Sequence, residues 1–185
     1  IANIAGVSRG TVDRALKNRP GVSLQTKEKI LKSNYFKIYN TLINDHSLID
    51  FCKKHGYKLI FKPHPNVYRF IELFETNDYV TIDSTSNSYN DIFTHASLII
   101  TDYSSIAFDF AYLKKPVIYY HYAKDYHFDL EESYFDYKTM GFGEVVDNHE
   151  ELIDLIMEYI ESECEMKNQY IKRVDDFFEF SDKNN

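Results

Sequence analysis

Two short polar segments of the sequence carry residue types that bind phosphate esters. The first, residues 62–65, reads Lys-Pro-His-Pro. The imidazole of His64 has a pKa range suited to stabilising charge on a phosphate or to protonating a leaving phosphate. The second, residues 101–105, reads Thr-Asp-Tyr-Ser-Ser. Both segments follow apolar runs, so we expect each to lie at the carboxyl end of a strand, where ligands of parallel sheets bind.

The second segment predicts a phosphate site in more detail. Ser104 and Ser105 stand at the start of an expected helix, where free N–H groups and a partial positive charge favour an anion. Asp109 follows Ser105 by four residues and shares its helical face, so its carboxylate can accept a hydrogen bond from a ligand hydroxyl beyond the phosphate. Asp102 adds a carboxylate at the end of the strand.

Each of these residues also has a purely structural interpretation, which the sequence leaves open. His64 between two prolines is alternatively a turn residue, and the two serines are alternatively helix caps. Asp102 is alternatively a cap or a residue that ends the strand. His95 is interpreted as a helix-end residue.

A metal site is a weaker hypothesis. Four potential ligands lie close together in the sequence, namely His121, Asp125, His127 and Asp129. Their irregular spacing favours a solvated loop, so we expect neither a metal nor another cofactor. Cys52 and Cys164 are far apart and have no CxxC partner, which excludes a zinc ribbon or a disulfide scaffold and fits a reducing cytoplasm.

The elements that must position these residues alternate along the chain from residue 40 onward. Continuous apolar strands that alternate with helices predict βαβ units around one parallel sheet, a Rossmann-like α/β domain. The strands are expected at residues 57–62, 79–82, 97–101, 116–120 and 145–146. The helices are expected at residues 42–55, 68–75, 88–95, 104–113 and 150–161.

The two polar segments together resemble a known enzyme family. Lys-Pro-His-Pro, followed by Thr-Asp-Tyr-Ser-Ser, Phe108-Asp109 and Lys115-Pro116 at fixed spacing, is similar to the CDP-glycerol glycerophosphotransferases, which polymerise teichoic acids. The resemblance runs from about residue 50 to about residue 150. It implies the C-terminal, donor-binding half of a GT-B fold.

The resemblance also implies roles for the residues. His64, Ser104 and Ser105 would hold the pyrophosphate of CDP-glycerol, and Asp109 would hold the glycerol hydroxyls. Glycerol phosphate would pass to a terminal hydroxyl of the teichoic-acid acceptor, and CMP would leave. In that family the base that activates the hydroxyl is credited to a second histidine in the N-terminal half. His46 and His55 do not stand in the setting expected for it.

The first 30 residues have a pattern that differs from that of the rest of the chain. A glycine turn at Gly6 between two short helical patterns, and a third helix from Leu24 to about Lys32 capped by Ser23, predict a helix-turn-helix. This run resembles the DNA-binding headpiece of the lactose-repressor family. The resemblance implies base contacts from Arg9, Gly10 and Arg14 and phosphate contacts from Ser8, Thr11 and Ser23.

Composition and charge bound these hypotheses. The 185 residues carry a net charge of −8, which divides into +5 over residues 1–32 and −13 over the rest. No apolar run is long enough to span a membrane and no secretory leader follows Ile1. We therefore expect a cytoplasmic protein with at most peripheral contact with the inner face of the membrane.

The sequence thus predicts a headpiece-like segment at residues 1–33 and a Rossmann-like, CDP-glycerol-binding half-domain at residues 40–180. The leading hypothesis is a glycerophosphotransferase that lacks its N-terminal GT-B half. The alternative is a DNA-binding transcriptional regulator with an atypical effector domain. A third interpretation is an accidental joining of two gene fragments, favoured by the abrupt switch at residues 31–40.

Overall fold

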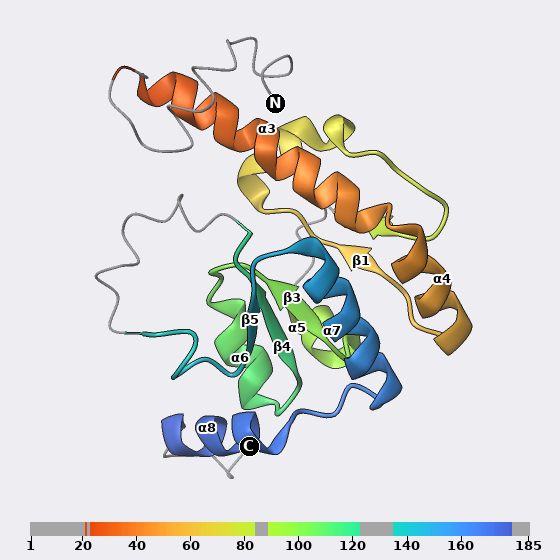
Figure 1. Cartoon of the computed structure of the whole chain (residues 1–185), viewed down its shortest axis with the longest axis vertical. Helices are drawn as coiled ribbons and strands as arrows, with labels where there is room; N and C mark the ends of the chain where they lie inside the picture. Colours follow the sequence, from red (N-terminus) through yellow and green to blue (C-terminus); the bar gives the residue numbers. More distant parts are fainter. Residues whose placement is uncertain (1–20, 22, 84–88, 123–134, 179–185) are drawn as a thin grey trace. The chain divides into compact units, whose positions relative to one another are not determined.

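The computed structural model describes residues 21, 23–83, 89–122 and 135–178 (Figure 1). The chain forms two compact units. One comprises Ile1–Thr85 with Asp125–Phe128, and the other comprises Ser86–Lys124 with Asp129–Asn185. Each unit has a parallel sheet and an apolar core of its own, so the prediction of an α/β protein with parallel strands is confirmed. The described strands form two sheets instead of the single sheet that was expected.

The first described element of this unit is the long helix α3 (Leu24–Ile43). Ser23 caps it as predicted, because its Oγ accepts a hydrogen bond from the Thr26 N–H at 3.2 Å. The prediction that this helix ends near Lys32 is wrong. No glycine or proline interrupts residues 24–43, so the helix continues through the segment where the sequence character changes. The division of the chain between residues 33 and 40 stays a prediction.

Helix α4 (His46–His55) follows, capped at its start by Asp45 and ended by Gly56, whose φ of 77° suits glycine. Strands β1 (Ile60–Phe61) and β2 (Thr81–Ile82) then pair in parallel. The 3₁₀ helix η1 (Pro65–Leu73) connects them, where the sequence predicted an α-helix over residues 68–75. Pro65 starts it early, because the fixed φ of proline suits a first helical position. A core cluster of this unit contains Phe36, Ile43, Ile49, Phe74 and Val80.

The second unit contains the three-stranded parallel sheet β3-β4-β5, formed by Ile99–Thr101, Val117–Tyr120 and Gly143–Val146. Its described helices are α5 (Tyr89–His95), α6 (Ile106–Tyr112), α7 (His149–Glu161) and α8 (Asn168–Phe177). In the view of Figure 1, α6 and α7 lie to either side of the strands. All four residues of β4 are buried, as expected for a central strand of a parallel sheet. The prediction missed α8.

Candidate functional site

Residues 62–64, which follow β1, are held in place by burial, a hydrogen bond and an ion pair. Pro63 is fully buried, whereas His64 is exposed, and the His64 carbonyl accepts a hydrogen bond from the Val67 N–H that opens η1. Lys62 Nζ lies 2.8 Å from Asp83 Oδ2. Because Lys62 follows β1 and Asp83 follows β2, this ion pair joins the carboxyl ends of the two strands next to His64.

The ion pair is more shielded than the surface pairs of the same unit. The side chains of Lys62 and Asp83 are 16% and 24% exposed, against 53% and 76% for Lys53 and Asp50. We expect Asp83→Asn to lower the free energy of unfolding by about 1–2 kcal/mol, because it removes the negative charge that lies against a shielded ammonium. Asp50→Asn, the same change in the exposed pair, is expected to cost less than about 0.5 kcal/mol. Urea unfolding of both variants tests this, and equal losses would contradict it.

The segment after β3 presents the two serines to solvent. Ser104 and Ser105 are both exposed, and α6 begins directly after them. The Ser104 Oγ lies 3.5 Å from the Ile106 N–H, whereas Ser105 makes no side-chain capping bond in α6. Asp109 is exposed in the first turn of α6. The Asp102 carboxylate accepts a hydrogen bond from the N–H of Tyr103 at 2.8 Å and does not cap α6, whose N-cap residue is Ser105.

A cluster of three aromatic rings packs against this segment. His121, which directly follows β4, is 7% exposed, and its ring stacks on that of Tyr103 with centroids 4.0 Å apart. Tyr137 packs edge-on against both rings. Burial and the Asp102 carboxylate raise the pKa of Tyr103 to about 12, so its hydroxyl stays protonated at neutral pH. The prediction that His121 lies in a solvated loop is therefore wrong.

Lys115 supports the same unit from the other end of α6. Its ammonium lies 2.7, 3.4 and 2.8 Å from the carbonyl oxygens of Phe93, Thr94 and Ala96. These carbonyls stand at the C-terminal end of α5, where helices leave carbonyl groups without intrahelical partners. Lys115 thus caps α5. The sequence marked this lysine only as part of a motif and gave no sign of its structural task.

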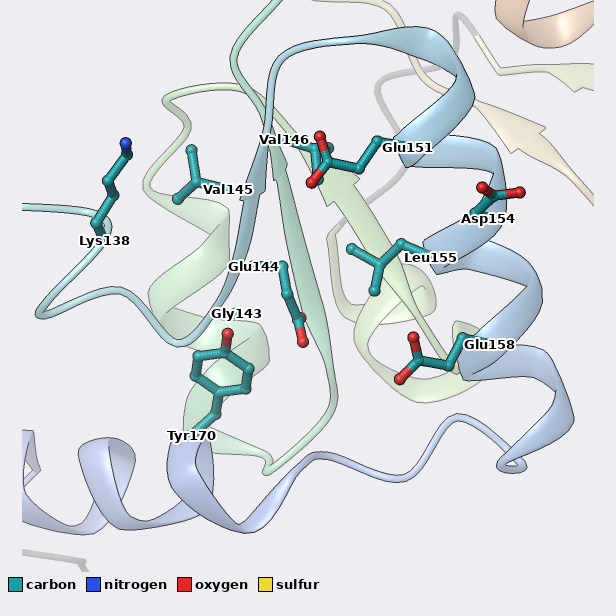
Figure 2. Close-up of a pocket in the computed structure, with 10 residues that line it drawn as sticks. All are labelled: Lys138, Gly143, Glu144, Val145, Val146, Glu151, Asp154, Leu155, Glu158 and Tyr170. Atoms are coloured by element: carbon teal, nitrogen blue, oxygen red, sulfur yellow. The ribbon is translucent and has the colours of Figure 1, made fainter.

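A pocket of about 420 Å³ lies in the second unit away from the predicted residues, none of which lines it (Figure 2). Its charged lining is mostly acidic, with Glu144 from β5 and Glu151, Asp154 and Glu158 from α7. Both carboxylate oxygens of Glu144 have partners within the fold. Its Oε2 accepts from the Tyr159 hydroxyl at 2.7 Å, and its Oε1 lies 2.7 Å from Lys167 Nζ. The pocket lining is therefore part of the packing between β5, α7 and the start of α8.

The structure places the predicted donor-binding residues in both units. His64 belongs to the first, and Asp102, Ser104, Ser105 and Asp109 belong to the second. Within the second unit, one short segment and the first turn of α6 bring these four together. The predicted DNA contacts Ser8, Arg9, Gly10, Thr11 and Arg14 lie outside the described residues, as do Asp125, His127 and Asp129.

The described residues contain neither a cluster of three or more His, Cys, Asp or Glu side chains suited to a metal ion nor a helix long and apolar enough to cross a membrane.

Comparison with known families decides between the two resemblances. Residues 19–185 match the family described as CDP-glycerol:poly(glycerophosphate) glycerophosphotransferase. The chain belongs to this family. The match begins within the segment predicted as a repressor headpiece, and nothing in the comparisons supports a helix-turn-helix or DNA binding at the N-terminus.

Individual glycerophosphotransferase relatives agree with this assignment. The chain is 51% identical over 157 residues to the minor teichoic acid biosynthesis protein GgaB of Bacillus subtilis, covering 85% of this chain and 17% of GgaB. It is 33% identical over 124 residues to a teichoic acid glycerol-phosphate transferase of Staphylococcus aureus, covering 66% of this chain and 30% of the relative. The chain therefore spans less than a third of the length of either relative.

A solved structure shares the fold. The wall teichoic acid polymerase TagF superposes with a TM-score of 0.60 at 20% identity, over 74% of this chain and 32% of TagF. A TagF variant soaked with CDPG gives a TM-score of 0.57 at 22% identity, over 75% of this chain and 33% of that one. About 74% of this chain thus has the fold of 32% of TagF.

Proposed function

We propose that this chain forms the donor-binding part of an enzyme that transfers glycerol phosphate from CDP-glycerol to a growing teichoic acid. The observation that carries the proposal is the exposed pair Ser104 and Ser105 at the carboxyl end of β3, in a chain of the glycerophosphotransferase family. Hydroxyls at the start of a helix are suited to the phosphate oxygens of a nucleotide. The identity of the donor is inferred from the family, of which the description names CDP-glycerol. A TagF variant was soaked with CDPG.

In this proposal each predicted residue has a defined role. Ser104 and Ser105 donate hydrogen bonds to the pyrophosphate, and Asp109 accepts from the hydroxyls of the glycerol. His64 binds the pyrophosphate as well. The acceptor hydroxyl attacks the phosphorus that bears glycerol, the bond to the bridging oxygen breaks, and His64 gives a proton to the departing CMP.

The acceptor hydroxyl also has to lose its proton. We propose that the base comes from the N-terminal half of a GT-B fold, of which this chain would be the Rossmann-like C-terminal half. The complete enzyme would work in the cytoplasm and would meet its polymer at the inner face of the membrane. No metal or cofactor is needed for the steps described above.

Calorimetry with CDP-glycerol tests this proposal. We expect a Kd between about 1 µM and 1 mM, since hydrogen bonds from solvent-exposed hydroxyls give modest affinity. His64→Ala is expected to weaken binding by about tenfold, because it removes one charge-assisted hydrogen bond. His55→Ala, which changes another exposed histidine of the same unit, is the matched control and should keep the wild-type Kd. A folded sample that does not bind CDP-glycerol would refute the proposal. Tighter binding of CDP-ribitol than of CDP-glycerol would show that CDP-ribitol is the donor.

A further inference from the structure

His121 is a buried polar residue that lies beneath the segment with the two serines. It directly follows β4, the strand next to β3 in the sheet, and its own N–H donates to the Val146 carbonyl at 2.7 Å. Its backbone is therefore held by the neighbouring strand β5. Its ring lies between tyrosines, stacked on Tyr103 with an angle of 17° and edge-on to Tyr137 with centroids 4.9 Å apart.

A hydrogen bond of the ring places a hydrogen on Nε2. Nε2 lies 3.2 Å from the backbone carbonyl oxygen of Asp102. Because a carbonyl oxygen only accepts, the hydrogen of this bond belongs to Nε2. The bond fixes the first peptide group after β3, at the point where the chain turns from the strand toward α6.

The same turn is held by its own short contacts. The Asp102 carboxylate accepts from the Tyr103 N–H, and the Ser104 carbonyl accepts from the Ala107 N–H at 3.3 Å. Residues 102–105 form no regular helix or strand, so these few bonds determine where Ser104 and Ser105 point. Among them, the bond from His121 is the one that ties the turn to the neighbouring strand.

We propose that His121 is the positioning residue of the donor-phosphate segment 102–105. Its Nε2–H holds the Asp102 carbonyl and its ring holds Tyr103, and together they keep the Ser104 and Ser105 hydroxyls presented to the ligand. His121 is buried under this segment and does not touch the donor. The part of the inference that concerns the donor rests on the function proposed above, whereas the part that concerns the turn does not.

Amide hydrogen exchange in the absence of ligand tests the positioning. His121→Phe keeps an aromatic ring but removes the donor, and His121→Gln keeps an N–H donor without the ring. We expect the N–H groups of Tyr103 and Ile106 to exchange about tenfold faster in His121→Phe, and close to wild-type rates in His121→Gln. Amides of α7 are the internal reference, because a general loss of stability would accelerate them equally. His95→Phe, at an exposed histidine of the same unit, is the matched control.

CDP-glycerol binding by the same variants tests the functional part. We expect His121→Phe to weaken binding by about tenfold and His121→Gln to recover most of it. If wild-type protein binds the donor and His121→Phe binds it equally well, the positioning role is wrong and the proposed function stands. If the wild type does not bind, the proposed function fails and hydrogen exchange alone decides the inference. Unchanged exchange at Tyr103 and Ile106 in His121→Phe would overturn it in every case.

Discussion

Gly143→Ala is expected to lower the free energy of unfolding by at least about 3 kcal/mol, at the upper end of what overpacking a core costs. Gly143 is the first residue of β5 and stands opposite Val117 of β4. A Cβ atom at this position would overlap the Val117 carbonyl oxygen and approach its carbonyl carbon to 2.6 Å. Because both obstacles are backbone atoms of a fully buried strand, no side chain can turn aside to make room.

Gly56→Ala is the matched control for this substitution. Gly56 has a φ of 77° and open space around the position of a Cβ atom, so alanine meets only backbone strain there. A single residue other than glycine in this left-handed backbone conformation lowers the free energy of unfolding by about 1–2 kcal/mol. Urea unfolding followed by circular dichroism gives both values. A loss in Gly143→Ala no larger than that in Gly56→Ala would show that β4 and β5 tolerate a wider separation than the structure has.

Alkaline unfolding should begin with the buried tyrosines. Burial raises the pKa of Tyr119 to about 12, although the N–H of Phe142, 3.4 Å from the hydroxyl oxygen, acts in the opposite direction. In the unfolded chain the pKa is about 10. A folded pKa above the unfolded one leaves stability intact below pH 10 and removes it as the pH rises from 10 to 12. The loss for Tyr119, which is fully buried, is about 2 kcal/mol at pH 12.

Tyr119→Phe is expected to flatten this loss, because phenylalanine has no proton to release. Tyr112→Phe, which removes the hydroxyl of an exposed tyrosine, should keep the wild-type dependence. Urea titrations at about pH 8, about pH 10 and about pH 11.5 give the free energy of unfolding at each pH. Parallel curves for wild type and Tyr119→Phe would contradict the role assigned to Tyr119.

Local chemistry accounts for what the sequence could predict. Runs such as residues 97–101 and 116–120 are apolar on both faces, and this pattern located β3 and β4 and the polar residues that end β3. The exposed positions of His64, Ser104, Ser105 and Asp109 agree with a binding role, which stays a prediction until a ligand is tested.

The misses arose where tertiary packing decides. Nothing in the local sequence says that His121 is covered by Tyr103 and Tyr137, since these tyrosines come from segments before β4 and before β5. The predicted helix was too short because the resemblance to a headpiece ends it near Lys32, whereas no helix-breaking residue occurs up to Ile43. Helix α8 had a readable signal, the spacing of Tyr170 and Val174, both of which are buried.

The capping of α5 by Lys115 bears on how mutational scans of this family should be interpreted. A variant without this lysine loses the hydrogen bonds that the ammonium donates to three carbonyl groups. Such a variant would reduce the amount of folded protein before it altered any step of the reaction. A screen that reports only polymer output would count Lys115 among the residues that handle substrate. Measuring soluble protein beside output would separate such framework residues from those that meet the donor.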